Sequence, residues 1–334
     1  MFYSPLPRTL PAALRDLDEA KPLVRAAAVL DLVKYVESHR DDVLKGLEKA
    51  VRDESAMVRA KAAEAVGDAG LVEGIEWLLD MIDDVSPIAR QNALLSLGLL
   101  KDERALETLK RALTDERPDV RFQATMAYPR VAARDDAVTA LLARTRDDDP
   151  DVVHIALRMT EELEDVVDER ILARARACLR HDAPHVRAVA AIVIATAGKD
   201  WADETLVQAT KGKLSPISPE DLGAILELVG DRGLTSAREA LEARARGGFL
   251  GLSKDPCQWH ARVALARLGD EKEKKAIMRE LSASDFGKRT MAVAAAARAQ
   301  ITEAIPLIEA MEGNPKRADA ETVREALRKL QGLT

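Results

Sequence analysis

Apolar and polar residues follow one another along the chain with the period of an α-helix, in short blocks separated by turn residues. Residues 106–113 (LETLKRAL) place leucine or alanine at every third or fourth position, which is the spacing of one buried helical face. Each such block is followed by an acidic residue, often a proline, then Val-Arg and alanines at helical spacing. The pattern predicts two short helices joined by a turn, in which the acidic residue caps the second helix and the proline lies in its first turn.

This pair of blocks recurs along the chain, and the residue after the valine, here called the arginine position, returns every 31 to 36 residues. The ten arginine positions are Arg25, Arg59, Arg90, Arg121, Val153, Arg187, Leu222, Gln258, Arg289 and Arg324. A single helix pair cannot bury its apolar face, so consecutive pairs must stack. The sequence therefore predicts an all-α fold, a right-handed α-solenoid of about ten helix pairs. We assign residues 1–17 to an N-terminal leader and 18–334 to a single solenoid with a glycine-rich insertion near 244–254.

The repeated pattern resembles that of the HEAT-repeat family, most closely the short repeats first described in phycobilin lyases, from about Pro22 to Leu330. The resemblance implies a ladder of hydrogen bonds between turn aspartates and the arginines of adjacent repeats. Its members would be Asp53, Asp84, Asp115 and Asp147 with Arg25, Arg59, Arg90, Arg121 and Arg187. Val153 would leave Asp147 without the arginine of its own repeat, so we expect the ladder to be irregular there.

The composition and the net charge of the chain indicate which classes of partner it can bind. Aromatic residues make up only 3% of the chain, which is typical of many small helices packed closely together. The net charge is −7, and residues 134–170 carry 12 acidic and 5 basic side chains, so this segment accounts for the whole imbalance. An acidic chain disfavours nucleic acid as a partner. The acidic segment is either a solvated surface or a surface that selects a basic protein partner.

Candidate chemistry is sparse. The sequence contains no phosphate-binding glycine loop, no HExxH and no GxSxG motif, and Cys178 and Cys257 lack metal-ligand spacing. Residues 147–151 (DDDPD) look like the start of a calcium loop, but Val152 and Arg158 stand where such a loop has glycine and glutamate. We therefore expect no cofactor, no metal ion and no catalytic residues.

Some proteins with HEAT-like repeats are enzymes, which leaves alternatives to a binding role. The iron-binding His-Glu pairs of deoxyhypusine hydroxylases are missing, because no histidine here is followed by glutamate. Bilin lyases share the repeat type, so a bilin lyase or isomerase-like enzyme is the alternative to a non-catalytic scaffold. A nucleic-acid-binding HEAT-like protein is the third interpretation, and the charge argues against it.

The second helices of the pairs should line the concave face of such a stack, with positions one, five and nine after the arginine position pointing outward. In the central repeats these positions hold the candidate partner-binding residues Gln91, Leu95, Leu99, Phe122, Met126, Arg130, His154, Arg158 and Ile192. Apolar residues at outward positions predict a groove that receives a helix or an extended segment of a protein partner. The alternative is that they are ordinary core residues.

The insertion adds two candidates, Phe249 within it and Trp259 just after it. Loops that interrupt a repeat are often functional, and this one either protrudes as a contact loop or folds back on the stack. The first residues do not have the pattern of a signal peptide, and no apolar stretch is long enough for a membrane span. We therefore expect a cytoplasmic adaptor with a protein partner and no membrane or nucleic-acid partner.

Overall fold

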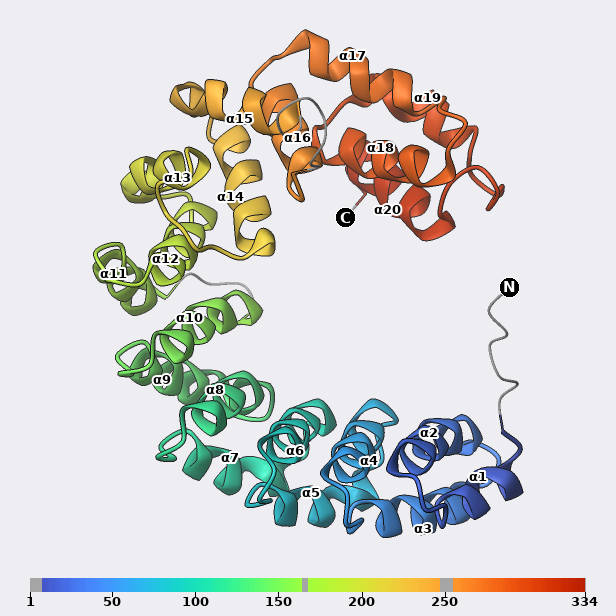
Figure 1. Cartoon of the computed structure of the whole chain (residues 1–334). Coiled ribbons are helices and arrows are strands. Elements are labelled where there is room, and N and C mark those ends of the chain that lie inside the picture. The colour runs from blue at the N-terminus through green and yellow to red at the C-terminus, as the bar shows by residue number, and fades with distance from the viewer. Residues whose placement is uncertain (1–7, 164–167, 247–254, 334) are drawn as a thin grey trace. The chain divides into compact units, whose positions relative to one another are not determined.

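A computed structural model of the chain describes residues 8–163, 168–246 and 255–333 (Figure 1). Within these ranges the chain forms twenty α-helices and several single 3₁₀ turns, and no strand. The chain divides into two compact units, residues 1–166 and 167–334.

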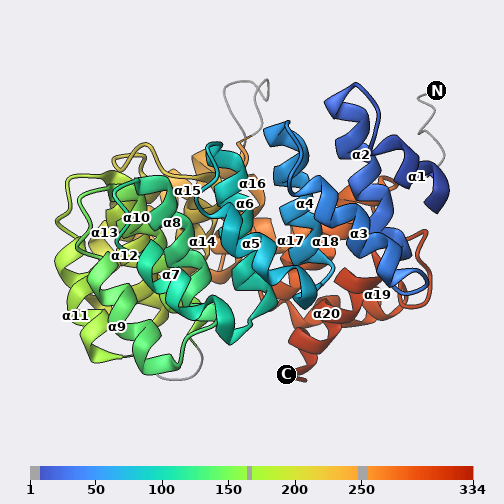
Figure 2. The same cartoon turned by 90° about the horizontal axis from the view of Figure 1, so that it is seen from below.

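The first unit consists of five helix pairs. The first helices of the pairs are α1 (Leu10–Asp16), α3 (Arg40–Ala50), α5 (Ile75–Met81), α7 (Leu106–Ala112) and α9 (Arg134–Arg144). The second helices are α2 (Pro22–Leu32), α4 (Ala56–Asp68), α6 (Pro87–Leu100), α8 (Pro118–Ala127) and α10 (Pro150–Met159). The 3₁₀ turns are η1 (Val33–Tyr35), η2 (Val72–Gly74), η3 (Glu103–Ala105), η4 (Tyr128–Arg130) and η5 (Thr160–Glu162). Each second helix packs against the next one, from α2 through α10, and Figures 1 and 2 both show this row.

The second unit consists of five more pairs. Its first helices are α11 (Glu169–Cys178), α13 (Asp203–Thr210), α15 (Arg238–Ala245), α17 (Glu271–Glu280) and α19 (Ile305–Glu309). Its second helices are α12 (Pro184–Thr196), α14 (Pro219–Asp231), α16 (Gln258–Arg267), α18 (Phe286–Arg298) and α20 (Ala320–Gln331). Its described 3₁₀ turns are η6 (Asp200–Ala202), η7 (Thr235–Ala237) and η9 (Thr302–Ala304). The second helices again pack in order, from α12 to α20.

All of the second helices except α4 and α16 begin at a side-chain cap or a proline. Six of them, α2, α6, α8, α10, α12 and α14, start with proline, which has no N–H to leave unsatisfied in the first turn. The carboxylate of Asp149 accepts from the backbone N–H of Asp151 at 2.8 Å, and the hydroxyl of Ser218 accepts from that of Asp221 at 3.0 Å. These side chains satisfy backbone donors that a helix start would otherwise expose.

Adjacent second helices pass very close to one another at small residues. A Cβ atom on Gly98 would lie 2.8 Å from the Cα of Ala127, and one on Gly230 would lie 2.7 Å from the Cα of Ala264. Both glycines stand eight residues after the arginine position of their helix. No larger side chain fits without moving backbone, so this close approach fixes how each repeat sits on the next.

The predicted architecture is confirmed: all ten arginine positions lie on the second helices of ten helix pairs, and the fold is an all-α solenoid. The predicted N-terminal leader of residues 1–17 includes a helix of the solenoid. Residues 10–16 form α1, which packs on α2 as the first helix of a pair. Residues 247–254 of the insertion lie outside the described residues. The assignment of residues 18–334 to a single solenoid stays a prediction.

Candidate partner-binding surfaces

Arginines on the second helices hold successive repeats of the first unit together. Arg59 donates through Nε and Nη2 to both carboxylate oxygens of Asp84 in the next repeat, at 2.6 and 2.7 Å. Its Nη1 donates to the backbone carbonyl of Asp53, in its own turn, at 2.8 Å. The hydrogen bonds from Arg59 hold the pKa of Asp84 below its ordinary value, against the opposing effect of burial. Arg25 binds Asp53 in the same way.

The ladder departs from the implied pairs at Asp115. Arg117, two residues further on, donates to both Asp115 carboxylate oxygens at 2.8 Å, so Arg90 turns to Asp119 at 3.2 Å. The implied pairing of Arg90 with Asp115 is therefore wrong, because a local arginine competes for the carboxylate. Asp147 is bound by Arg121 of the preceding repeat, so Val153 does not leave it unpaired.

The candidate partner-binding residues on the second helices, here called the predicted strip, are only partly exposed. Leu99 is 47% exposed, whereas the side chains of Gln91, Leu95, Phe122, Met126, Arg130, His154 and Arg158 are half-buried. Met126 packs against the buried cluster of Leu141, Ala156 and Met159. Arg130 is paired with Glu162 at 3.1 Å and Arg158 with Glu161 at 3.0 Å. On α8 and α10 the strip is thus largely occupied by the protein's own contacts.

Ile192 is 3% exposed, so its predicted exposure is wrong. Nine of the thirteen residues of α12 are buried, because this helix is apolar around its circumference and packs against α11, α13 and α14. Trp259 is half-buried and contacts the guanidinium of Arg262, 4.4 Å from the ring centroid. It packs against the core of α16 to α20. Phe249 lies outside the described residues.

A row of exposed apolar side chains, which the sequence analysis missed, crosses the first unit one helical turn before the predicted strip. Leu23, Met57 and Ile88 each stand two residues before the arginine position of α2, α4 and α6, and they are 71%, 50% and 54% exposed. We call these three residues the apolar row. Leu30 and Leu99, on the same helical face, are 43% and 47% exposed. The same helical periodicity, continued one turn toward the N-terminus of each second helix, leads to these positions two residues before the arginine position.

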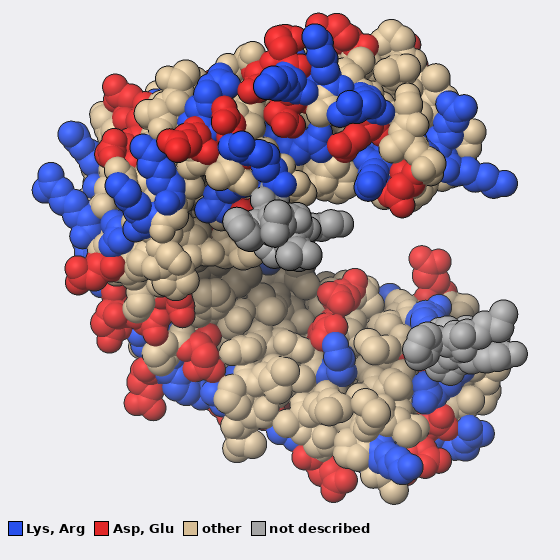
Figure 3. Space-filling view, turned by 45° about the horizontal axis from the view of Figure 1, so that its top comes forward, with Lys and Arg blue, Asp and Glu red and all other residues tan. Residues whose placement is uncertain are grey.

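The rest of the surface of the first unit combines uncharged and charged side chains. In the lower part of Figure 3, wide stretches of uncharged surface lie between small groups of charged side chains. Acidic side chains occupy the turns that lead into the second helices: those of Glu54 and Asp148 are 84% and 93% exposed. The N-terminal ends of these helices therefore combine apolar side chains with negative charge.

On the second unit the second helices carry a polar cluster instead. His260 Nδ1 lies 2.7 Å from Glu227 Oε1, and Arg298 donates to the same oxygen at 3.0 Å. Burial works to raise the pKa of Glu227, but the hydrogen bond with His260 and the charge of Arg298 hold it below its ordinary value. The His260 ring lies against Gly223, where a Cβ would come within 3.0 Å of Nε2. The cluster joins α14, α16 and α18.

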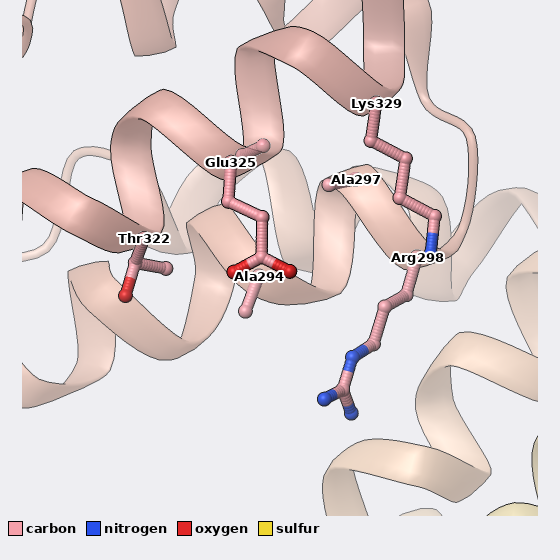
Figure 4. A pocket seen from close by; sticks show the side chains of 7 residues that line it. Ala294, Ala297, Arg298, Thr322, Glu325 and Lys329 are labelled. Carbon is pink, nitrogen blue, oxygen red and sulfur yellow. The ribbon is translucent and has the colours of Figure 1, made fainter. Parts of the chain in front are cut away.

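A crevice between α18 and α20 lies beside this cluster (Figure 4). Ala294, Ala297 and Ala326 form its apolar part, and Arg298, Thr322, Glu325 and Lys329 its polar part. Its volume of about 70 Å³ is far below the several hundred Å³ of a typical small-molecule site. The crevice can accept a single side chain or a few water molecules.

The described residues show three further features. Within residues 8–163, 168–246 and 255–333, no three His, Cys, Asp or Glu side chains come together as a metal site would require. Cys178 and Cys257 are both buried and not joined in a disulfide, and burial raises the pKa of the Cys257 thiol. Among the described helices, none has the length and apolar character to cross a membrane.

Comparisons with known proteins agree with this fold. A family model for HEAT repeats matches residues 9–91 and 75–160. Among solved structures, the Escherichia coli protein YibA is similar over 78% of this chain and 93% of its own, with 17% identity and a TM-score of 0.51. The complex of CpcE and CpcF of phycocyanin lyase from Nostoc sp. PCC7120 is similar over 72% and 96%, with 18% identity and a TM-score of 0.45. Human deoxyhypusine hydroxylase is similar over 87% and 96%, with 17% identity and a TM-score of 0.35. No curated protein matches the chain.

Stacked two-helix repeats define the class of α-solenoids. Residues 9–160 of this chain consist of HEAT repeats according to the family model, and the same two-helix repeat continues through the described residues of the second unit. At 17% identity, the likeness to YibA extends to the fold and not to an activity.

Proposed function

We propose that the chain is a non-catalytic protein-binding scaffold whose first unit receives a partner on the face of its second helices. One observation carries the proposal: the apolar row places large exposed side chains at the same position of three consecutive repeats. Single exposed apolar residues are common, but an aligned set on neighbouring helices is typical of a binding surface. The positions of Leu30 and Leu99 widen this surface toward the other end of the helices.

The spacing of the row suits a linear segment. Packed helices lie about 8–10 Å apart, and seven residues of a helix rise about 10 Å. Apolar residues seven apart on a partner helix can therefore meet Leu23, Met57 and Ile88 in turn. Residues three apart on a polyproline II segment, which rise about 9 Å, match the same spacing. Both forms are frequent modes of peptide recognition.

Replacing Met57 and Ile88 together by glutamate should abolish partner binding, because two charges would stand where the partner's apolar side chains lose water. Affinity capture from a lysate of the source organism, quantified by mass spectrometry for wild type and variant in parallel, measures the loss. Val72→Glu is the matched control, since Val72 is also an exposed apolar residue, at 42%, but lies in the 3₁₀ turn before α5. Equal capture by wild type and the double variant, with unchanged circular dichroism melts, would contradict the proposal.

The partner segment carries basic residues in this proposal, because exposed acidic side chains flank the apolar row at the same ends of the helices. Glu54 and Asp83, 84% and 74% exposed, stand in the turns before α4 and α6. Reversing these two charges with Glu54→Lys and Asp83→Lys should slow association and remove most of its dependence on ionic strength. Association rates of the captured partner, measured by surface plasmon resonance at low and high salt, test this. Rates that do not change with salt in the wild-type protein would mean that the acidic turns play no part.

A further inference from the structure

Three arginines of the first unit use the guanidinium group in one way. Arg25, Arg59 and Arg121 each donate through Nη1 to backbone carbonyls of their own turn. Each then presents its Nε–Nη2 edge to an aspartate of the next repeat, and both nitrogens bind that carboxylate at 2.6 to 3.0 Å. The turn thus orients the guanidinium so that its Nε–H and Nη2–H donors, here called its fork, fit the two oxygens of a carboxylate.

Arg187, at the start of α12, has the same anchor but a different neighbour. Its Nη1 donates to the backbone carbonyls of His181 and Asp182 in its own turn, the second at 2.8 Å. The loop of the next repeat, residues 211–218 (KGKLSPIS), contains two lysines and no acidic residue. Pro216 stands at the place that Asp53 and Asp84 occupy in their repeats, six before the arginine position.

The Nε–Nη2 edge of Arg187 is therefore open. Within the part of the chain that the structure describes, neither nitrogen donates to another residue, and neither belongs to the buried polar atoms without a partner, so both reach solvent. Arg289 differs, because its Nε and Nη2 are met by the backbone carbonyls of Arg317 and Lys316 at 2.6 and 3.3 Å. Arg90 differs as well, because Asp119 lies against its Nη2.

We propose that Arg187 is a carboxylate-binding site, at which a ligand or partner carboxylate takes the place that an aspartate of the next repeat takes in the first unit. The site is preorganised, because the bonds to the turn carbonyls already hold the guanidinium in the orientation that binds Asp53, Asp84 and Asp147 elsewhere. Lys211 and Lys213, both exposed, add positive charge to the loop of the next repeat, in which Pro216 stands in place of the aspartate. A planar fork of two N–H donors matches a carboxylate better than a spherical anion.

The carboxylate has three sources: a free small acid, an Asp or Glu side chain of a protein, or the C-terminus of a chain. Four probes separate them at constant ionic strength: sodium acetate, the peptide acetyl-Gly-Asp-Gly-amide, its Asn analogue, and acetyl-Gly-Gly with a free C-terminus. The full-length protein is labelled with ¹⁵N, and the arginine Nε–H resonances are followed by NMR. Arg187→Lys assigns the resonance of Arg187.

We expect the Arg187 resonance to move in a saturable manner with the carboxylate probes and not with the Asn peptide. The resonances of Arg25 and Arg121, whose forks already hold aspartates, should not move. Pro216→Asp, which supplies a carboxylate from the chain itself, should weaken the binding of each probe at least about tenfold, as should Arg187→Lys. A response no larger than that of the exposed Arg324, or an equal response to sodium chloride, would overturn the proposal. Circular dichroism melts of both variants establish that they remain folded.

Discussion

Replacing Arg59 by methionine should lower the free energy of unfolding of the first unit by about 3 kcal/mol, the cost of leaving one member of a buried ion pair without the other. The side chains of Arg59 and Asp84 are only 14% and 10% exposed, and the two Arg59 bonds are the ladder contacts of Asp84. Methionine keeps much of the apolar stem, so the change removes mainly charge and hydrogen bonds. Urea unfolding followed by far-ultraviolet circular dichroism measures the loss.

The same variant should lose its defect in acid. Asp84 has a lowered pKa in the folded protein, so its pairing with Arg59 stabilises the fold above the unfolded-state pKa of about 3.9. This contribution disappears as the pH falls through the folded-state pKa. The difference between wild type and Arg59→Met should thus be large at neutral pH and shrink below about pH 4. Arg59→Met combined with Asp84→Asn is the control, because it leaves no carboxylate without a partner, and a defect as large as that of Arg59→Met alone would contradict this account.

The repeat architecture could be predicted because its cause is local and periodic. Each arginine position stands in a short pattern of acidic residue, proline and alanines, and those residues determine the helix start and the close packing wherever they recur. Even degenerate positions such as Leu222 and Gln258 lie on the expected second helices, because stacking between neighbouring repeats supports a weak local pattern.

Pairing between repeats could be predicted less well, since it depends on competition in three dimensions. Asp115 stands at the same repeat position as Asp84, but it is followed two residues later by Arg117 where Asp84 is followed by Ser86. Only the geometry of the turn decides whether Asp115 pairs with Arg90 or with Arg117. The open fork of Arg187 is visible in the sequence as Pro216 in place of an aspartate. The sequence does not show how the Arg187 guanidinium is oriented, whereas the structure shows that Nη1 donates to the backbone carbonyl of Asp182.

Exposure was the hardest property to read from the sequence. Helical spacing identifies a face but not what covers it. The outward residue Ile192 of α12 is buried, whereas the outward residues of α6 range from half-buried to exposed. Met126 was predicted as a contact residue, but the neighbouring repeat packs against it. The prediction does not include Leu23, because it counts outward positions only in the central repeats and only after the arginine position. The same helical face extends one turn further toward the N-terminus.

Replacing Ile192 by glutamate should therefore destabilise the second unit by about 4 kcal/mol or more, because a carboxylate at a position that is 3% exposed must lose its hydration without a partner. Leu99→Glu is the matched control: Leu99 stands at an outward position of α6, is 47% exposed, and should tolerate the charge with a change of less than about 1 kcal/mol. Urea unfolding of both variants measures the difference. The buried carboxylate should also have a raised pKa, so the defect of Ile192→Glu should shrink as the pH falls below that pKa. Equal and small defects in the two variants would mean that the outward face of α12 is open to solvent and available to a partner, as the helical spacing alone predicts.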